Sequence, residues 1–195
     1  MNLQKLNLEN KVVLLEGTRK VPSDQESVLI NFTTRLASDY PNAIFRSGNA
    51  AGSDELFAKG IESIDAKRMQ QVLPYPNANK KRLHKQSPVI SLADLTMDEL
   101  QELAEIGIQA TPSYESLFKL YLKDLNKTRV TIKAMYLLRD ALKILGCPRL
   151  GFAAADCGFF FTDETNPTGG GTGHTIRMCE IKNIPVYTQC DWLNK

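Results

Sequence analysis

The sequence predicts an α/β fold, a Rossmann-like three-layer sandwich with a mainly parallel sheet and a helical insert, and three observations support this prediction. Short continuous apolar runs alternate with stretches of helical periodicity, as in a parallel sheet that helices bury on both faces. Three such strand–loop–helix steps fall within residues 11–75. Glycine-rich segments follow several of the runs. The 195 residues are expected to form one domain over 1–195, with the insert at about 77–127.

Three strands are expected in the first part of the chain, at Lys11–Glu16, Ala43–Arg46 and Gln71–Pro74. A capping box at Ser23–Glu26 begins the helix after the first run, and Pro41 ends it. After the second run, apolar and small residues recur at helical spacing on the inner face of another helix, namely Leu56, Phe57, Gly60, Ile61 and Ile64.

The segment 77–127 breaks this alternation and is expected to hold two short helices. Thr96–Glu99 is a capping box that begins one of them, and Pro112 lies near the start of the other. The sequence leaves open whether these helices are inserted in the sheet or lie over it.

The alternation resumes after the insert. The strongest helical periodicity of the chain, at Thr128–Leu145, ends before Pro148. Three further elements are then expected: a buried strand at Cys157–Phe161, a short helix from about His174 to Lys182, and a last strand at Ile184–Tyr187.

Composition and charge exclude several classes of protein. The chain has 24 Lys and Arg against 22 Asp and Glu, a formal net charge of +2, so a nucleic-acid partner is not expected. Its 2 histidines and 4 cysteines show no zinc-site spacing, and no metal is expected. The apolar run Val12–Leu15 is too short for a signal or membrane segment. A cytoplasmic protein with reduced thiols and no membrane partner is expected.

Three glycine-rich segments carry the functional prediction. Gly17–Arg19 and Ser47–Asp54 follow the first two expected strands, and Gly169–Thr175 precedes the last helix. In an open parallel sheet, ligands bind beyond the carboxyl ends of the strands. Glycine lets backbone amides approach an anion, and a helix N-terminus adds partial positive charge. The third segment therefore predicts a phosphate site, although each segment alone could be only a tight turn.

None of these segments is a standard nucleotide motif. Gly-Lys-Ser/Thr does not occur, so there is no Walker A motif, and Gly48–Gly52 is not a GxGxxG fingerprint. A standard nucleoside triphosphatase or dinucleotide dehydrogenase is therefore not expected.

Taken together, the three segments resemble those of the SLOG superfamily, which includes DNA-processing protein A and the "lonely guy" phosphoribohydrolases. The resemblance covers residues 11–75 and 128–190 and leaves the insert outside it. It implies a Rossmann-like fold that binds a nucleotide or a nucleotide-derived ligand. Members often pair through helices, so a homo-oligomer is left open.

Carried over position by position, the resemblance implies a ligand-binding set from the three segments and from the start of the long helix. Arg129 lies where members often place an arginine that faces the ligand, although Val130 follows it here in place of an asparagine. The candidate ligand-binding residues are Gly17, Thr18, Arg19, Ser47, Gly48, Asn49, Gly52, Ser53, Asp54, Arg129, Gly169, Gly170, Gly171, Thr172, Gly173, His174 and Thr175.

Catalysis is where this chain departs from the phosphoribohydrolases. Their segment Pro-Gly-Gly-x-Gly-Thr-x-x-Glu ends in a glutamate that assists cleavage of an N-glycosidic bond, and Thr175 occupies that place here. A threonine cannot supply the negative charge that stabilises an oxocarbenium-like centre. Asp54 and His174 remain as candidate catalytic groups, and either could instead cap its helix.

Three functions are predicted, in order of preference. The first is binding of a nucleotide or nucleotide-derived ligand at the glycine-rich loops. The second is hydrolysis of an N-glycosidic or phosphate linkage in a nucleotide. The third is binding of single-stranded DNA, which the near-neutral charge disfavours. The expected partner is a small phosphorylated ligand, whose base and number of phosphates stay open.

Overall fold

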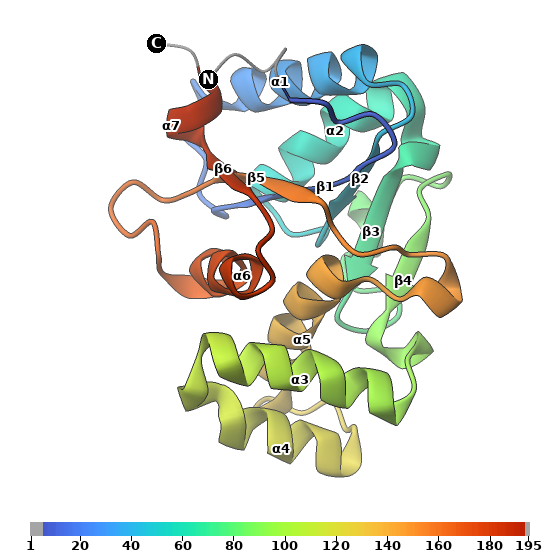
Figure 1. The fold of residues 1–195 in the computed structure, drawn as a ribbon, viewed down its shortest axis with the longest axis vertical. Helices are drawn as coiled ribbons and strands as arrows, with labels where there is room; N and C mark the ends of the chain where they lie inside the picture. The colour runs from blue at the N-terminus through green and yellow to red at the C-terminus, as the bar shows by residue number, and fades with distance from the viewer. Residues whose placement is uncertain (1–5, 194–195) are drawn as a thin grey trace.

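The computed structural model describes residues 6–193 and shows three layers around one sheet (Figure 1). All six strands are parallel, in the order β4-β3-β2-β1-β5-β6. The strands are β1 (Val12–Gly17), β2 (Ile44–Ser47), β3 (Met69–Leu73), β4 (Val89–Ser91), β5 (Cys157–Phe161) and β6 (Val186–Thr188). The predicted α/β fold with a mainly parallel sheet is confirmed.

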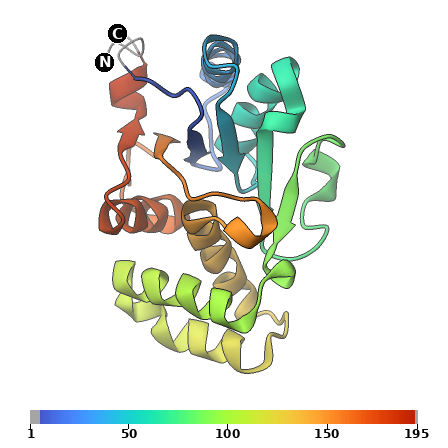
Figure 2. The same cartoon turned by 45° about the vertical axis from the view of Figure 1, so that its right-hand side comes forward.

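Seven α-helices are found within residues 6–193, and they cover both faces of the sheet. One face carries α1, α2 and α7, and the other carries α5 and α6, with α3 and α4 packed outside them (Figures 1 and 2). The helices are α1 (Glu26–Asp39), α2 (Ser53–Asp65), α3 (Met97–Ala110), α4 (Glu115–Asp124), α5 (Thr131–Leu145), α6 (Gly170–Ile181) and α7 (Gln189–Trp192).

Strand β1 shows how the sequence assigns side chains to the two faces. Successive side chains of a strand point to opposite faces. Val13 and Leu15 accordingly belong to the core under α1 and α2, and Leu14 belongs to the core under α3 and α5. Glu16 continues the series of Leu14, so its side chain enters the layer that holds α5 and α6. A carboxylate is thereby placed inside the protein.

The segment 77–127 contains a strand that the sequence analysis did not predict. Strand β4 has three residues, pairs with β3 at the sheet edge, and exposes Val89. An apolar pattern of three residues is too short to be recognised as a strand. The two predicted helices are present as α3 and α4, and they lie over α5 and α6 rather than within the sheet (Figure 1).

The last long helix begins earlier than its sequence predicts. A helix was expected from about His174, whereas α6 begins at Gly170 and takes three glycines into its first turn. Glycine is a poor helix former, so the sequence pattern places the start too late. The glycine-rich segment is therefore the N-terminal turn of a helix, and its backbone amides point out of the helix end.

Two further observations concern the described part of the chain. Cys147, Cys157 and Cys179 are buried free thiols, and burial raises the pKa of Cys157 and Cys179 to about 12. Between residues 6 and 193 the structure contains no helix of the length and apolarity that crossing a membrane requires. The predicted cytoplasmic location stays a prediction.

Candidate functional site

A cavity of about 700 Å³ opens at the carboxyl ends of β1 and β5. These neighbouring strands are the point where the chain order of the sheet reverses direction, which is where open α/β sheets bind ligands. Three segments supply most of the lining: the end of β1 and its loop (Glu16–Arg19), the segment Asp163–Thr172, and one face of α5 from Ile132 to Asp140. The cavity is thus built from the strand ends that the glycine-rich segments follow.

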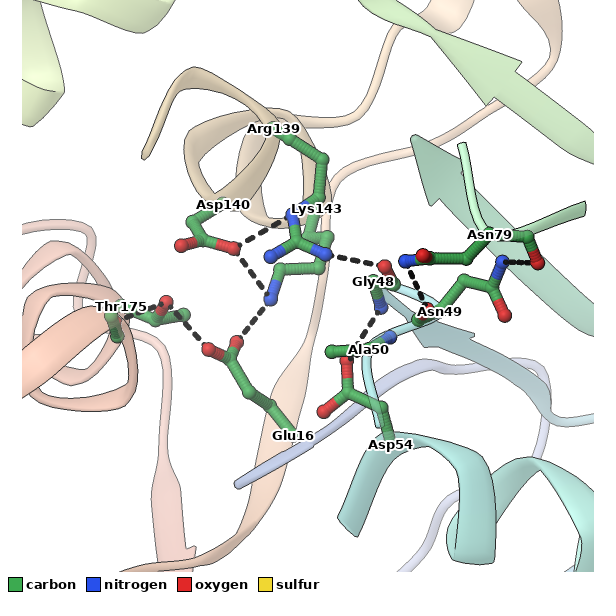
Figure 3. Close-up of polar contacts among 11 residues, drawn as sticks. Glu16, Gly48, Asn49, Ala50, Asp54, Asn79, Arg139, Asp140, Lys143 and Thr175 are labelled. Atoms are coloured by element: carbon green, nitrogen blue, oxygen red, sulfur yellow. Dashed lines mark hydrogen bonds and ion pairs between the residues drawn. The ribbon is translucent and has the colours of Figure 1, made fainter. Parts of the chain in front are cut away.

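The floor of the cavity is a buried network of charged side chains (Figure 3). Glu16 forms an ion pair with Lys143 on α5, and Thr175 on α6 donates a hydrogen bond of 3.0 Å to the other oxygen of Glu16. Asp140 Oδ1 lies 3.0 Å from Lys143 Nζ and 2.9 Å from Arg139 Nε. The Lys143 residue is fully buried, so its charge is balanced by these carboxylates alone.

The positions of these charges follow from the strand and the helix that carry them. Glu16 lies opposite Phe160 of β5 and shares the inner face with Leu14. From Ala134 to Ile144, α5 is buried at every position except Tyr136. Because this part of α5 is buried on nearly all sides, the charged side chains that it carries are buried too. Buried charges require partners of opposite charge.

Burial and neighbouring charges shift the pKa values of the floor residues in opposite directions. Burial raises the pKa of Glu16 to about 7, although the positive charge of Lys143 opposes this effect. Burial also acts to raise the pKa of Asp140, but the charges of Arg139 and Lys143 outweigh it and lower that pKa. The floor therefore holds one carboxylate that stays ionised and one that titrates near neutral pH.

The loop after β2 forms one wall of the cavity. Asp54, at the start of α2, holds this loop in place. Its Oδ2 accepts hydrogen bonds from the amides of Gly48 (3.1 Å) and Ala50 (3.4 Å). Gly48 also accepts a hydrogen bond from the Arg139 guanidinium through its carbonyl oxygen, and a Cβ there would lie 1.9 Å from that guanidinium. This glycine is required for close packing and does not itself line the cavity.

The N-terminal turn of α6 forms another wall of the cavity. Gly169, Gly170, Gly171 and Thr172 all line the cavity. The first amides of a helix have no acceptor within the helix and carry its partial positive charge. The Gly173 amide donates to the Gly169 carbonyl oxygen (3.0 Å), and the Gly169 amide donates to that of Asn166 (3.1 Å). The amides of Gly170, Gly171 and Thr172 between them have no acceptor among the described residues and can meet a ligand.

Aromatic rings and cations alternate at the rim. The guanidinium carbon of Arg19 lies 5.9 Å from the ring centroid of Tyr136, and Lys133 Nζ lies 4.8 Å from that of Tyr114. Beyond Tyr136, the ring of Tyr75 packs edge-on at 6.5 Å. Arg19 and Lys133 are both exposed, so the positive charge of the cavity faces outward while its floor carries the carboxylates.

Eight predicted ligand-binding residues line the cavity, and nine do not. Those in the lining are Gly17, Thr18, Arg19, Asp54, Gly169, Gly170, Gly171 and Thr172. Those outside it are Ser47, Gly48, Asn49, Gly52, Ser53, Arg129, Gly173, His174 and Thr175. Several of the second group act behind the wall: Ser53 donates to the Thr18 carbonyl oxygen (2.8 Å), which joins the first two glycine-rich loops.

His174 differs from its expected position at an open helix end. Because α6 begins four residues earlier, the imidazole is fully buried between α6 and the insert, 2.9 Å from Thr111 Oγ1. Burial lowers the pKa of His174 to about 4. Arg177 donates to the same Thr111 oxygen, which fastens the insert to α6. The ring is therefore neutral near pH 7 and does not line the cavity. Of the two candidate catalytic groups, only Asp54 lines it.

Arg129 lies outside the long helix, which begins at Thr131 instead of Thr128. In the turn before the helix, the Thr128 hydroxyl accepts a hydrogen bond from the Thr131 amide (3.1 Å). Arg129 is exposed in the turn before the helix and is absent from the cavity lining.

Sequence reasoning missed the floor and much of the rim. The missed residues are Glu16, Tyr114, Lys133, Tyr136, Arg139, Asp140 and Lys143. A signal for the α5 members is present in the sequence, because Arg139, Asp140 and Lys143 interrupt the mainly apolar stretch from Ala134 to Leu145. Within residues 6–193 there is no cluster of side chains that could hold a metal ion.

Comparison with known proteins gives a likeness of fold. No protein-family model matches the chain, and no curated protein matches it by sequence. A solved structure of DNA processing protein A from Helicobacter pylori, described for its single-stranded DNA binding mode, superposes with a TM-score of 0.53 at 17% identity. The match covers 92% of this chain and 65% of that one, so it spans less than two thirds of the neighbour.

Proposed function

We propose that the cavity binds a nucleotide, with the phosphate at the N-terminus of α6 and the base at the aromatic rim. The observation that carries this proposal is the free amides of Gly170–Thr172 lining a cavity at the switch point of a parallel sheet. Arg19 lies in the same lining and supplies a planar cation suited to a phosphate. No lysine of a Walker A motif is needed, because backbone amides and Arg19 carry the positive potential.

The distribution of charge supports one orientation of the ligand. The floor carries Glu16, Asp54 and Asp140, which repel a phosphate, whereas the exposed cations Arg19 and Lys133 lie at the rim. We therefore expect the phosphate at the amides of Gly170–Thr172 and at Arg19, and not on the floor. Tyr136 is half-buried and presents its ring to the cavity, where it can stack on a base.

A thermal-shift screen of nucleoside mono-, di- and triphosphates tests this proposal. We expect at least one nucleotide to raise the melting temperature of the wild type. Arg19→Ala is expected to lose most of that shift, while Arg35→Ala, an equal loss of charge on the far face at α1, keeps it. No shift with any nucleotide, or equal shifts in both variants, would contradict the proposal.

Single-stranded DNA is the second candidate, because the structural neighbour is described as binding it. That likeness weakens the argument from net charge. A row of side chains on this chain favours the same candidate. Lys127 Nζ lies 3.4 Å from the ring centroid of Tyr75, the Tyr75 ring packs against that of Tyr136, and Arg19 lies over Tyr136. Alternating rings and cations are the surface on which single-stranded bases stack.

Fluorescence anisotropy with a labelled oligo(dT) tests this second candidate. Binding that weakens as salt is raised, and that Tyr75→Ala and Lys127→Ala reduce, would support it. Lys123→Ala is the matched control, since Lys123 is an exposed lysine of α4 outside the cavity lining. Absence of binding at low salt would remove the candidate.

A further inference from the structure

Two carboxylates on the cavity floor each keep one oxygen without a hydrogen bond or ion pair among the described residues. We infer that the cavity selects ribonucleotides over deoxyribonucleotides, because Asp54 and Asp140 accept hydrogen bonds from the ribose hydroxyls. This inference rests on the nucleotide site proposed above.

Asp140 is held by its ion pairs and aimed into the cavity. Its Oδ1 contacts Arg139 Nε at 2.9 Å and Lys143 Nζ at 3.0 Å, whereas no contact holds Oδ2. The side chain is only 4% exposed, yet it belongs to the lining. A Cβ on Gly171 would lie 3.4 Å from Oδ2, so this oxygen faces the first turn of α6. An acceptor that is held in place in this way and opens on the cavity is available to a hydrogen-bond donor of a ligand.

Asp54, the other floor carboxylate, also has one oxygen held by the protein and one oxygen open to the cavity. Two backbone amides, those of Gly48 and Ala50, fix its Oδ2, and Oδ1 has no partner (Figure 3). The residue is 2% exposed and also belongs to the lining. Both carboxylates are thus oriented by protein contacts before any ligand arrives, and each offers one oxygen to the same cavity.

The chemistry of these two oxygens selects a neutral donor. An ionised carboxylate accepts hydrogen bonds and repels a phosphate, so the phosphate cannot occupy the floor. The floor already holds two cations, Arg139 beside Asp140 and Lys143 beside Glu16, so a neutral donor from the ligand fits there better than a further cation. Ribose hydroxyls are neutral donors, and O–H···O⁻ bonds are among the stronger hydrogen bonds in proteins.

The neighbouring walls agree with this placement. Gly170–Thr172, proposed for the phosphate, and Tyr136, proposed for the base, line the same cavity as Asp54 and Asp140. The sugar joins these two groups in a 5′-nucleotide, so it must pass over the floor between them. The 2′-hydroxyl is what distinguishes ribose from deoxyribose, and a buried polar group left unpaired by its absence costs affinity.

The test is isothermal titration calorimetry of the full chain with the four ribonucleoside 5′-monophosphates and with their 2′-deoxy and 3′-deoxy counterparts. The deoxy compounds are expected to bind about 10- to 100-fold more weakly than the matched ribonucleotide. Ribonucleotides and deoxyribonucleotides that bind within twofold of each other would overturn the inference while leaving the proposed site intact. No binding by either series would overturn both.

Two variants separate recognition by these carboxylates from a purely structural role. Gly171→Ala adds a methyl beside Asp140 Oδ2 at ordinary contact distance and leaves the ion pairs in place. It is expected to reduce the preference for ribose at least threefold, without lowering the melting temperature of the free protein, because alanine is a better helix former than glycine. Asp98→Asn, at an exposed position of α3 outside the cavity lining, is the control and should keep the preference. An unchanged preference in Gly171→Ala would count against Asp140.

Discussion

The two faces of the sheet are filled in different ways. Beneath α1, α2 and α7 the core is apolar and rich in aromatic rings; Phe32 stacks on Trp192 with centroids 4.1 Å apart and meets Phe159 edge-on at 5.3 Å. Beneath α5 and α6, apolar packing surrounds a buried network of four charged side chains, Glu16, Arg139, Asp140 and Lys143, at the cavity. The same sheet therefore carries one face built for packing and one built around charge.

This difference indicates what the charges are for. Replacing a buried ion network by apolar residues is often neutral or stabilising, so such a network is not needed to hold a sheet together. The face under α1 and α2 demonstrates this within the same chain, since it is packed without one. The charges under α5 are better explained by the cavity that they line.

The largest expected effect is on Lys143. Lys143→Met leaves Glu16 and Asp140 buried with one cation fewer, and we expect a loss of about 3–5 kcal/mol in the free energy of unfolding. Urea denaturation measures it. Adding Glu16→Gln to Lys143→Met removes one of the orphaned charges and should restore part of the loss. A double variant no more stable than the single one would contradict the network as described.

The apolar face provides the matching measurement. Phe57 is fully buried on α2, and Phe57→Ala is expected to cost about 3–5 kcal/mol through loss of packing. This loss should be the same at pH 5 and pH 8, because no titrating group is involved. The loss in Lys143→Met should change between these two pH values, since Glu16 titrates between them. Equal pH dependence in the two variants would remove the distinction between the faces.

Two titrating groups on the charged face are expected to act against each other. The pKa of Glu16 is raised from 4.5 to about 7, so its contribution to stability is full below pH 4.5 and is lost as the pH rises through about 7. The pKa of His174 is lowered from 6.5 to about 4, so its contribution is full above pH 6.5 and is lost as the pH falls through about 4. Each amounts to about 2 kcal/mol between pH 5 and pH 8.

Single variants separate these opposing slopes. Glu16→Gln is expected to leave a protein that loses stability toward acid, and His174→Gln one that loses stability toward alkaline pH. Urea denaturation at several pH values between 5 and 8 measures both slopes. His84→Gln, at an exposed position, is the control and should follow the wild type. Identical slopes in Glu16→Gln and His174→Gln would contradict the assignment of buried charge to this face.

The smallest expected effect compares two lysines of one helix. Lys133 is exposed near the start of α5, whereas Lys143 is buried near the end of the same helix. Lys133→Ala is expected to change the free energy of unfolding by less than about 0.5 kcal/mol, because an exposed charge contributes little. In calorimetry the same variant should weaken nucleotide binding severalfold. A stability loss comparable to that of Lys143→Met would mean that the rim also holds the fold.

The sequence predicts the fold better than it predicts the site. Continuous apolar runs identified five of the six strands, because parallel strands are apolar on both faces. The three residues of β4 were too few to show a pattern. The glycine-rich segments indicated the sheet edge at which the cavity lies, since strand ends in a parallel sheet meet at one edge.

The floor of the site escaped prediction because its charges look like surface residues in the sequence. Arg139, Asp140 and Lys143 become buried only when α5 is covered by the sheet on one side and by α3 and α4 on the other. Glu16 ends an apolar strand, where a polar residue ordinarily marks the exit to solvent. His174 was misplaced for a related reason: its burial depends on the insert, whose position over α6 no local pattern reveals.

The measurement that tests the central claim most directly is a crystal structure of the protein with a bound ribonucleoside 5′-monophosphate. The account predicts phosphate oxygens within hydrogen-bond distance of the amides of Gly170–Thr172, and ribose hydroxyls against Asp54 and Asp140. A nucleotide bound outside the cavity, stacked on Tyr75 beside Lys127, with the α6 amides unoccupied, would contradict it and would favour the single-stranded DNA surface instead.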